Sequence, residues 1–87
     1  MPRTVSREKL DEFVGVYHAE LTKAVAEHPE DYGYSVENVP GVVVKMRRAF
    51  EDGTYNCGGR AIRAACRTLG IKHTRASMEL YFSAEEN

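Results

Sequence analysis

Apolar residues recur at three- and four-residue steps through most of this chain, the spacing that places side chains on one face of an α-helix. The longest such stripe begins just after Ser6, a residue type that caps helix starts, and ends before Pro29, which cannot continue a helix. Its apolar members are Leu10, Phe13, Val14, Tyr17, Leu21, Ala24 and Val25. The pattern predicts a helix from about residue 6 to residue 28, about 33 Å long, as the spine of the fold.

A second, shorter stripe predicts a helix that begins between Asn38 and Pro40 and ends before Gly53. Its apolar positions are Val39, Val43, Met46 and Phe50. The run of valines at 42–44 is β-branched, as is common in strands. The helical spacing of the stripe nevertheless favours a helix.

Two further helices are expected in the C-terminal third. The first, over residues 57–69, is capped by Asn56 and ended by Gly70. Its inner stripe is Ile62, Ala65, Cys66 and Leu69. The second is about ten residues long and follows Thr74, a capping residue. Its expected inward positions are Ala76, Leu80 and, as a weaker candidate, Tyr81.

Every element that the pattern predicts is helical. The sequence therefore predicts an all-α fold, a four-helix domain whose C-terminal part, about 56–83, is a helix-turn-helix-like unit. Eighty-seven residues hold one hydrophobic core, so residues 1–87 are expected to form a single domain.

The composition is that of an ordinary globular protein, with 43% apolar and 29% charged residues. No apolar run approaches the roughly 20 residues that span a bilayer, and the first residues lack the apolar segment of a secretory signal. The expected location is the cytoplasm, without a membrane partner. Cys57 and Cys66 match neither a CxxC motif nor zinc spacing, and Cys66 is expected in the core.

Charge is unevenly distributed along the chain. Residues 1–44 carry four basic and eight acidic side chains, a net charge of −4. Residues 45–75 carry eight basic and two acidic side chains, a net charge of +6, and residues 76–87 carry −3. A basic middle between acidic ends suggests one positive face that binds nucleic acid or an acidic partner. The alternative is that these arginines only solvate two helices.

Residues 63–82, RAACRTLGIKHTRASMELYF, resemble the helix-turn-helix of DNA-binding proteins, most nearly the Fis type. A small residue, Cys66, stands four positions before Gly70, and Leu69 and Ile71 flank that glycine. Glycine adopts the left-handed turn without strain. The resemblance implies that the second helix lies in the major groove of DNA while the first crosses the backbone.

Two positions depart from that family pattern. Ala76 is smaller than the usual branched residue, and Glu79 stands where an apolar core residue is usual. Glu79 also brings negative charge to the helix that would enter the groove. If Glu79 points sideways and pairs with Arg75, four residues earlier, the second helix remains compatible with DNA.

The resemblance also implies a set of contact residues. Those expected to face base edges or nearby phosphates are Lys72, His73, Thr74, Ser77, Met78 and Tyr81. Those expected near phosphates are Arg63, Arg67 and Arg75, with Arg60 as a further contact. The alternative for His73 is a solvated turn histidine.

No motif for catalysis, a cofactor or a metal stands out. His18 and His28 have no partner at ligand spacing in the sequence, and the segment GTYNCGGR at 53–60 lacks the lysine of a phosphate loop. The sequence therefore predicts neither an enzyme nor a bound metal or cofactor.

The leading hypothesis is a DNA-binding helix-turn-helix protein. The chain as a whole also resembles small phage and prophage proteins, through GTYN at 53–56 and CRTLGIKHT at 66–74, which implies a regulator in the bacterial host cytoplasm. A monomer this small reads few base pairs of double-stranded DNA, so a homodimer is expected, with the long first helix as its candidate interface. The alternative is a protein-binding module, such as a phage-encoded inhibitor of a host protein complex.

Overall fold

The computed structural model of this chain describes residues 5–55 and 59–83. Its α-helices are α1 (Arg7–Glu27), α2 (Val39–Glu51), α3 (Arg60–Leu69) and α4 (Arg75–Phe82). Two 3-10 helices, η1 (Pro29–Asp31) and η2 (Val36–Asn38), turn the chain from α1 into α2. The described residues contain no strand, only an isolated bridge between Val5 and Ser83, so the all-α prediction is confirmed.

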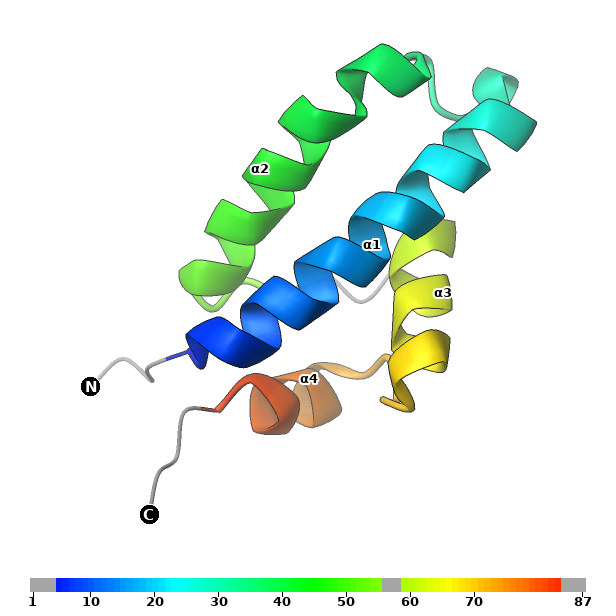
Figure 1. Ribbon diagram of the computed structural model, residues 1–87. Coiled ribbons are helices and arrows are strands. Elements are labelled where there is room, and N and C mark those ends of the chain that lie inside the picture. Colours follow the sequence, from blue (N-terminus) through cyan, green and yellow to red (C-terminus); the bar gives the residue numbers. More distant parts are fainter. Residues whose placement is uncertain (1–4, 56–58, 84–87) are drawn as a thin grey trace.

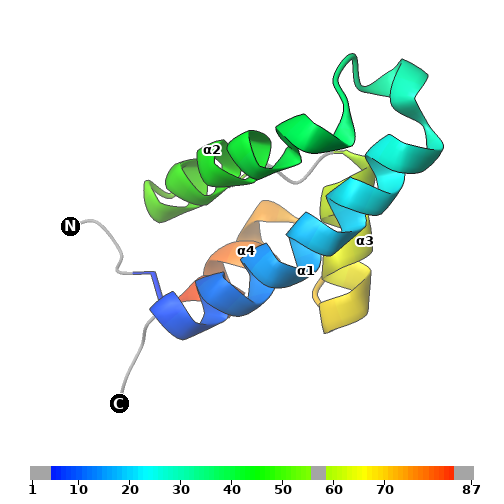
Figure 2. The same cartoon turned by 45° about the horizontal axis from the view of Figure 1, so that its top comes forward.

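The long helix α1 is the spine of the domain. Helix α2 runs along one side of α1, α3 packs against its C-terminal half, and α4 lies against its N-terminal half (Figures 1 and 2). Within the described residues, no Cα atom of α2 lies within 8 Å of one in α3. Each of the three shorter helices is therefore positioned by α1. No helix in the described part is both long and apolar enough to cross a membrane.

The helix boundaries follow from local sequence signals. The hydroxyl of Ser6 accepts a hydrogen bond from the backbone N–H of Lys9, which caps α1 as expected. Helix α3 ends at Gly70, whose φ of 72° lies in the left-handed region that favours glycine. The expected start of this helix, with Asn56 as cap and Cys57 in the first turn, lies outside the described residues.

Aromatic rings form the centre of the core. Phe13 of α1, Phe50 of α2 and Phe82 of α4 are each fully buried, with ring centroids 5.3–5.4 Å apart. Tyr55 joins them, 5.2 Å from Phe50 and 5.6 Å from Phe82. Contacts of this kind contribute about 0.5–1.5 kcal/mol per pair beyond the area they bury. The sequence pattern identified Phe13 and Phe50 as core residues and missed Tyr55 and Phe82.

The face of α4 that packs inward differs from the prediction. Met78 and Phe82 are fully buried, whereas Leu80 is 75% exposed and Ala76 is exposed. The prediction placed Ala76, Leu80 and Tyr81 inward, a register that also suits a helix-turn-helix, in which the second helix packs against the first. Here no Cα atom of α4 lies within 8 Å of one in α3, and α4 packs on α1 and the aromatic rings instead.

Candidate nucleic-acid interface

Helix α3 has two chemically distinct sides. Its inner side buries Ala61, Ile62, Ala65 and Cys66. Three arginines, Arg60, Arg63 and Arg67, recur at three- and four-residue steps on its outer side, and all three are exposed. We call these three residues the arginine face. The spacing follows from the helical repeat, which aligns such positions over about 10 Å of helix axis.

The arginine face is also hollowed. Its three arginines, together with Gly59 and Ala64, line a shallow depression of about 470 Å³. Ala64, which also lines a pocket between α1 and α3, contributes only a methyl group at the edge of this face. A surface of this shape brings three guanidinium groups around one concave patch, which suits a group that carries several negative charges.

The charges of this face are only partly neutralised. Arg60 Nη2 lies 3.3 Å from the Asp31 carboxylate of η1. Among the described residues, Arg63 and Arg67 make no ion pair. Two guanidinium groups are therefore available to an external anion, and a third is held by a solvent-exposed pair of the kind that contributes only about 0–1 kcal/mol.

The turn after α3 adds a second group of polar residues beside this face. Lys72, His73 and Thr74 are all exposed, as the sequence predicted. The hydroxyl of Thr74 accepts a hydrogen bond from the backbone N–H of Ser77 at 3.2 Å, so Thr74 caps α4. A hydroxyl that accepts one hydrogen bond can still donate its own proton, so exposed Thr74 can contact a ligand together with Lys72 and His73.

Three residues expected to face DNA are buried or half-buried. Met78 is fully buried in the core, so its expected contact with bases is wrong. Tyr81 is half-buried against α1: its hydroxyl donates a hydrogen bond to Glu12 Oε1 at 3.4 Å, and Lys9 Nζ lies 4.6 Å from its ring centroid. Burial, and then the nearby charge of Glu12, raises the pKa of Tyr81 above its usual value. The third, Ser77, is half-buried.

The pairing of Arg75 with Glu79 is present. Arg75 Nε donates to Glu79 Oε2 at 3.3 Å, one helical turn away on α4. The outer surface of α4 therefore presents a neutralised ion pair beside the exposed side chains of Ala76 and Leu80. This surface offers few hydrogen-bonding groups for reading base edges.

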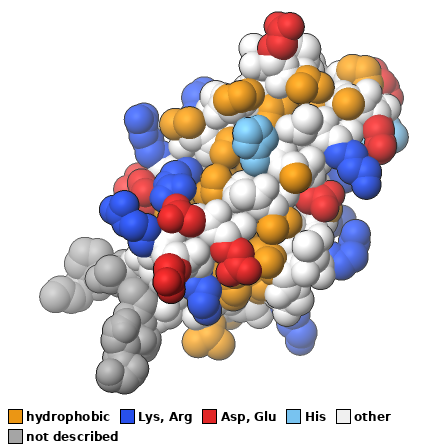
Figure 3. All heavy atoms as spheres, in the orientation of Figure 1, with side chains coloured by type: hydrophobic (Ala, Val, Ile, Leu, Met, Phe, Trp, Pro, Cys, Tyr) orange, Lys and Arg blue, Asp and Glu red, His pale blue; other side chains and the backbone are white. Residues whose placement is uncertain are grey.

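The basic middle of the sequence does not form one face. Lys45, Arg47 and Arg48 belong to α2, on a different side of α1 from the arginine face. Basic side chains accordingly lie along two separate edges of the surface in Figure 3. Arg47 is also engaged, in ion pairs with Asp11 and Glu51, which raise its pKa. The expected single positive face is thus two smaller ones, and that of α3 lines a depression.

Comparisons with family models, curated proteins and solved structures found no match to this chain. The function is therefore inferred from the chemistry of the surface. The arginine spacing was visible in the sequence, whereas Asp31 and Ala64, which shape the same face, carried no sequence signal.

Proposed function

We propose that this protein binds double-stranded DNA through the phosphate backbone, with the arginine face of α3 as its main contact surface. The observation that carries the proposal is the exposure of Arg63 and Arg67, which have no ion-pair partner in the described chain and line one depression. Guanidinium groups form paired hydrogen bonds with phosphate oxygens, and phosphate contacts supply most of the affinity of such proteins.

The polar turn extends this contact. Lys72 and His73 follow α3 directly and are exposed, so a backbone that lies along the arginine face can continue over the turn. Arg60 joins when its contact with Asp31 is exchanged for a phosphate. Roughly four neutralised phosphates predict a steep dependence on salt, with a slope of about −0.9 for each phosphate.

Base reading is a smaller part of this proposal than the resemblance implied. Met78 is buried, Tyr81 is held by α1, and Arg75 is paired with Glu79. A regulator of the phage type would have to discriminate sequences mainly through Lys72 and His73 in the turn. We therefore expect binding that differs little between duplexes of different sequence.

The test is a fluorescence anisotropy titration of labelled duplex DNA at several salt concentrations, with two double variants. Arg63→Ala with Arg67→Ala removes two charges from the arginine face. Lys45→Ala with Arg48→Ala removes the same charge from α2, where both side chains are exposed and unpaired among the described residues. The first variant should weaken binding and reduce the salt slope by about two, and the second should change both much less. Equal losses of DNA affinity in the two double variants would refute the proposal. So would a wild-type protein that does not bind DNA at low salt.

The exposure of Leu80 favours a second candidate, a protein-binding module. Leu80 is 75% exposed and stands one turn after exposed Ala76, which gives α4 a small apolar outer surface. Exposed apolar patches with a polar rim mark protein–protein interaction sites. A pull-down from bacterial lysate treated with nuclease tests this candidate. A host protein that the wild type retains and the Leu80→Glu variant does not would support protein binding over DNA binding.

A further inference from the structure

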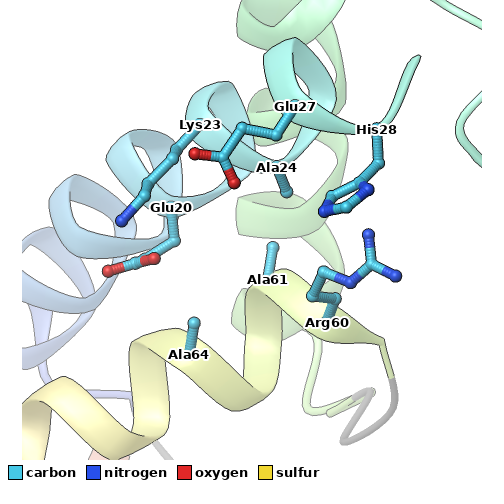
Figure 4. Close-up of a pocket in the computed structure, with 8 residues that line it drawn as sticks. All are labelled: Glu20, Lys23, Ala24, Glu27, His28, Arg60, Ala61 and Ala64. Atoms are coloured by element: carbon cyan, nitrogen blue, oxygen red, sulfur yellow. The ribbon is translucent and has the colours of Figure 1, made fainter.

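Three potential metal ligands come together where α1 ends. His28 follows the last residue of α1, and Glu30 and Asp31 belong to η1. One ligand atom from each side chain lies within 4.8 Å of the others. Figure 4 shows His28 at the end of α1 beside Arg60, at the rim of a small pocket of about 100 Å³ between α1 and α3.

The backbone holds this turn in place. The N–H of His28 donates to the carbonyl of Ala24 at 2.8 Å, and the N–H of Asp31 donates to the carbonyl of His28 at 3.0 Å. Pro29 restricts the conformation between them. The three side chains are therefore presented from one ordered turn, and only their own torsions must adjust to a ligand.

The chemistry of the three groups fits a transition-metal ion better than Mg²⁺ or Ca²⁺. Imidazole nitrogens and carboxylate oxygens are both Zn²⁺ ligands, whereas Mg²⁺ and Ca²⁺ take oxygen ligands. Zinc bonds of about 2.0–2.2 Å place tetrahedral ligand atoms about 3.4 Å apart. Because Glu30 and Asp31 are exposed and His28 is half-buried, rotation of the side chains can bring the ligand atoms to that spacing.

The charge balance also favours a cation. Of the two carboxylates, that of Asp31 pairs with Arg60 at 3.3 Å, and that of Glu30 has no ion pair among the described residues. The turn therefore keeps an excess of negative charge near His28. A divalent ion would bind both carboxylates, and Arg60 would then be released from Asp31 toward the arginine face.

We propose that His28, Glu30 and Asp31 form a binding site for one divalent transition-metal ion of the Zn²⁺ class, with water completing the coordination. The site is distinct from the arginine face and does not require DNA binding. The site was not predicted from the sequence, because His28, Glu30 and Asp31 have neither zinc-finger nor helical ligand spacing; a 3-10 turn instead brings together positions one, three and four of a short segment.

Calorimetric titration with Zn²⁺ in a buffer that does not coordinate metals tests the site. All proteins carry Cys57→Ser, because a thiol would bind Zn²⁺ independently of this turn. Three variants are compared with this background: His28→Ala, Glu30→Gln and, as the matched control, His18→Ala, which removes an exposed imidazole from α1. Far-UV circular dichroism confirms that each variant is folded.

We expect one equivalent of Zn²⁺ to bind the background protein and His18→Ala alike, and His28→Ala to weaken binding by roughly tenfold or more. Glu30→Gln should also weaken it. Absence of binding to the background protein would overturn the proposal. So would unchanged affinity in both His28→Ala and Glu30→Gln, since the ion would then be bound elsewhere.

Discussion

Asp31 Oδ2 lies 3.3 Å from Arg60 Nη2, which joins the turn after α1 to the first residue of α3. Both side chains are about half exposed, so the pair contributes little to stability, on the order of 0–1 kcal/mol. Its importance is positional. It determines whether the third guanidinium of the arginine face is directed toward η1 or toward a ligand.

Removal of this carboxylate should therefore strengthen DNA binding. In a buffer that contains a chelator, Asp31→Ala is expected to raise the affinity for duplex DNA by a factor of about two more than Glu30→Ala does. Both variants remove one negative charge from η1, but only Asp31 contacts Arg60. Anisotropy titrations measure the difference; identical affinities would show that the contact does not restrain Arg60.

Two apolar residues of α4, one buried and one exposed, should respond differently to truncation. Phe82→Ala is expected to lower the free energy of unfolding by about 3–5 kcal/mol, because Phe82 is fully buried among four other rings. Leu80→Ala should change it by less than about 0.5 kcal/mol, because Leu80 is 75% exposed. Denaturation in urea measures both. A large loss with Leu80→Ala would restore the register that the sequence predicted.

Two glycines with open surroundings should also respond oppositely to alanine. Gly70 has a φ of 72°, and no atom lies within 4 Å of an added Cβ, so Gly70→Ala costs only backbone strain, about 1–2 kcal/mol. Gly15 lies within α1, is exposed and has the same free space, so Gly15→Ala should stabilise by about 0.5–1 kcal/mol. Thermal denaturation gives both shifts. A neutral Gly70→Ala would contradict the left-handed turn.

Tyr17, in the middle of α1, should lose its phenolic proton at a higher pH than an exposed tyrosine does. Burial, followed by the proximity of Tyr34 and Tyr32, raises the pKa of Tyr17 to about 12. In the unfolded chain the same phenol ionises near 10, so the unfolded state loses its proton first. The stability that Tyr17 contributes is therefore complete below about pH 10 and is lost as the pH rises from there toward 12.

Absorbance at an ultraviolet wavelength specific for phenolate measures this titration. Tyr17→Phe should remove the last component of the curve and leave the earlier ones in place. The pKa values of Tyr34 and Tyr81 are also raised by burial, so the comparison with the variant is what assigns the component. A curve whose last component persists in Tyr17→Phe would contradict the assignment.

Local signals in the sequence were sufficient to predict the four α-helices and the turn at Gly70. These signals could not predict which side of α4 faces the core, because apolar side chains lie on several sides of this short helix: Met78, Leu80, Tyr81 and Phe82. Tertiary packing, of Phe82 against Phe13, Phe50 and Tyr55, decides that Met78 and Phe82 are buried and Leu80 is exposed. Similarly, the arginine spacing on α3 was visible, but the separation of the basic residues of α2 and α3 depends on α1 lying between them.

The contact between residues 5–6 and 82–83 has a consequence for engineering. Val5 forms an antiparallel bridge with Ser83, and the N–H of Ser6 donates to the carbonyl of Phe82 at 2.8 Å. A short peptide that joined the two segments would span almost no distance and would cost little loop-closure entropy. The domain is therefore suited to backbone cyclisation. It is also suited to circular permutation, with new termini opened at 33–35, beyond the end of α1 and away from the contact between residues 5–6 and 82–83.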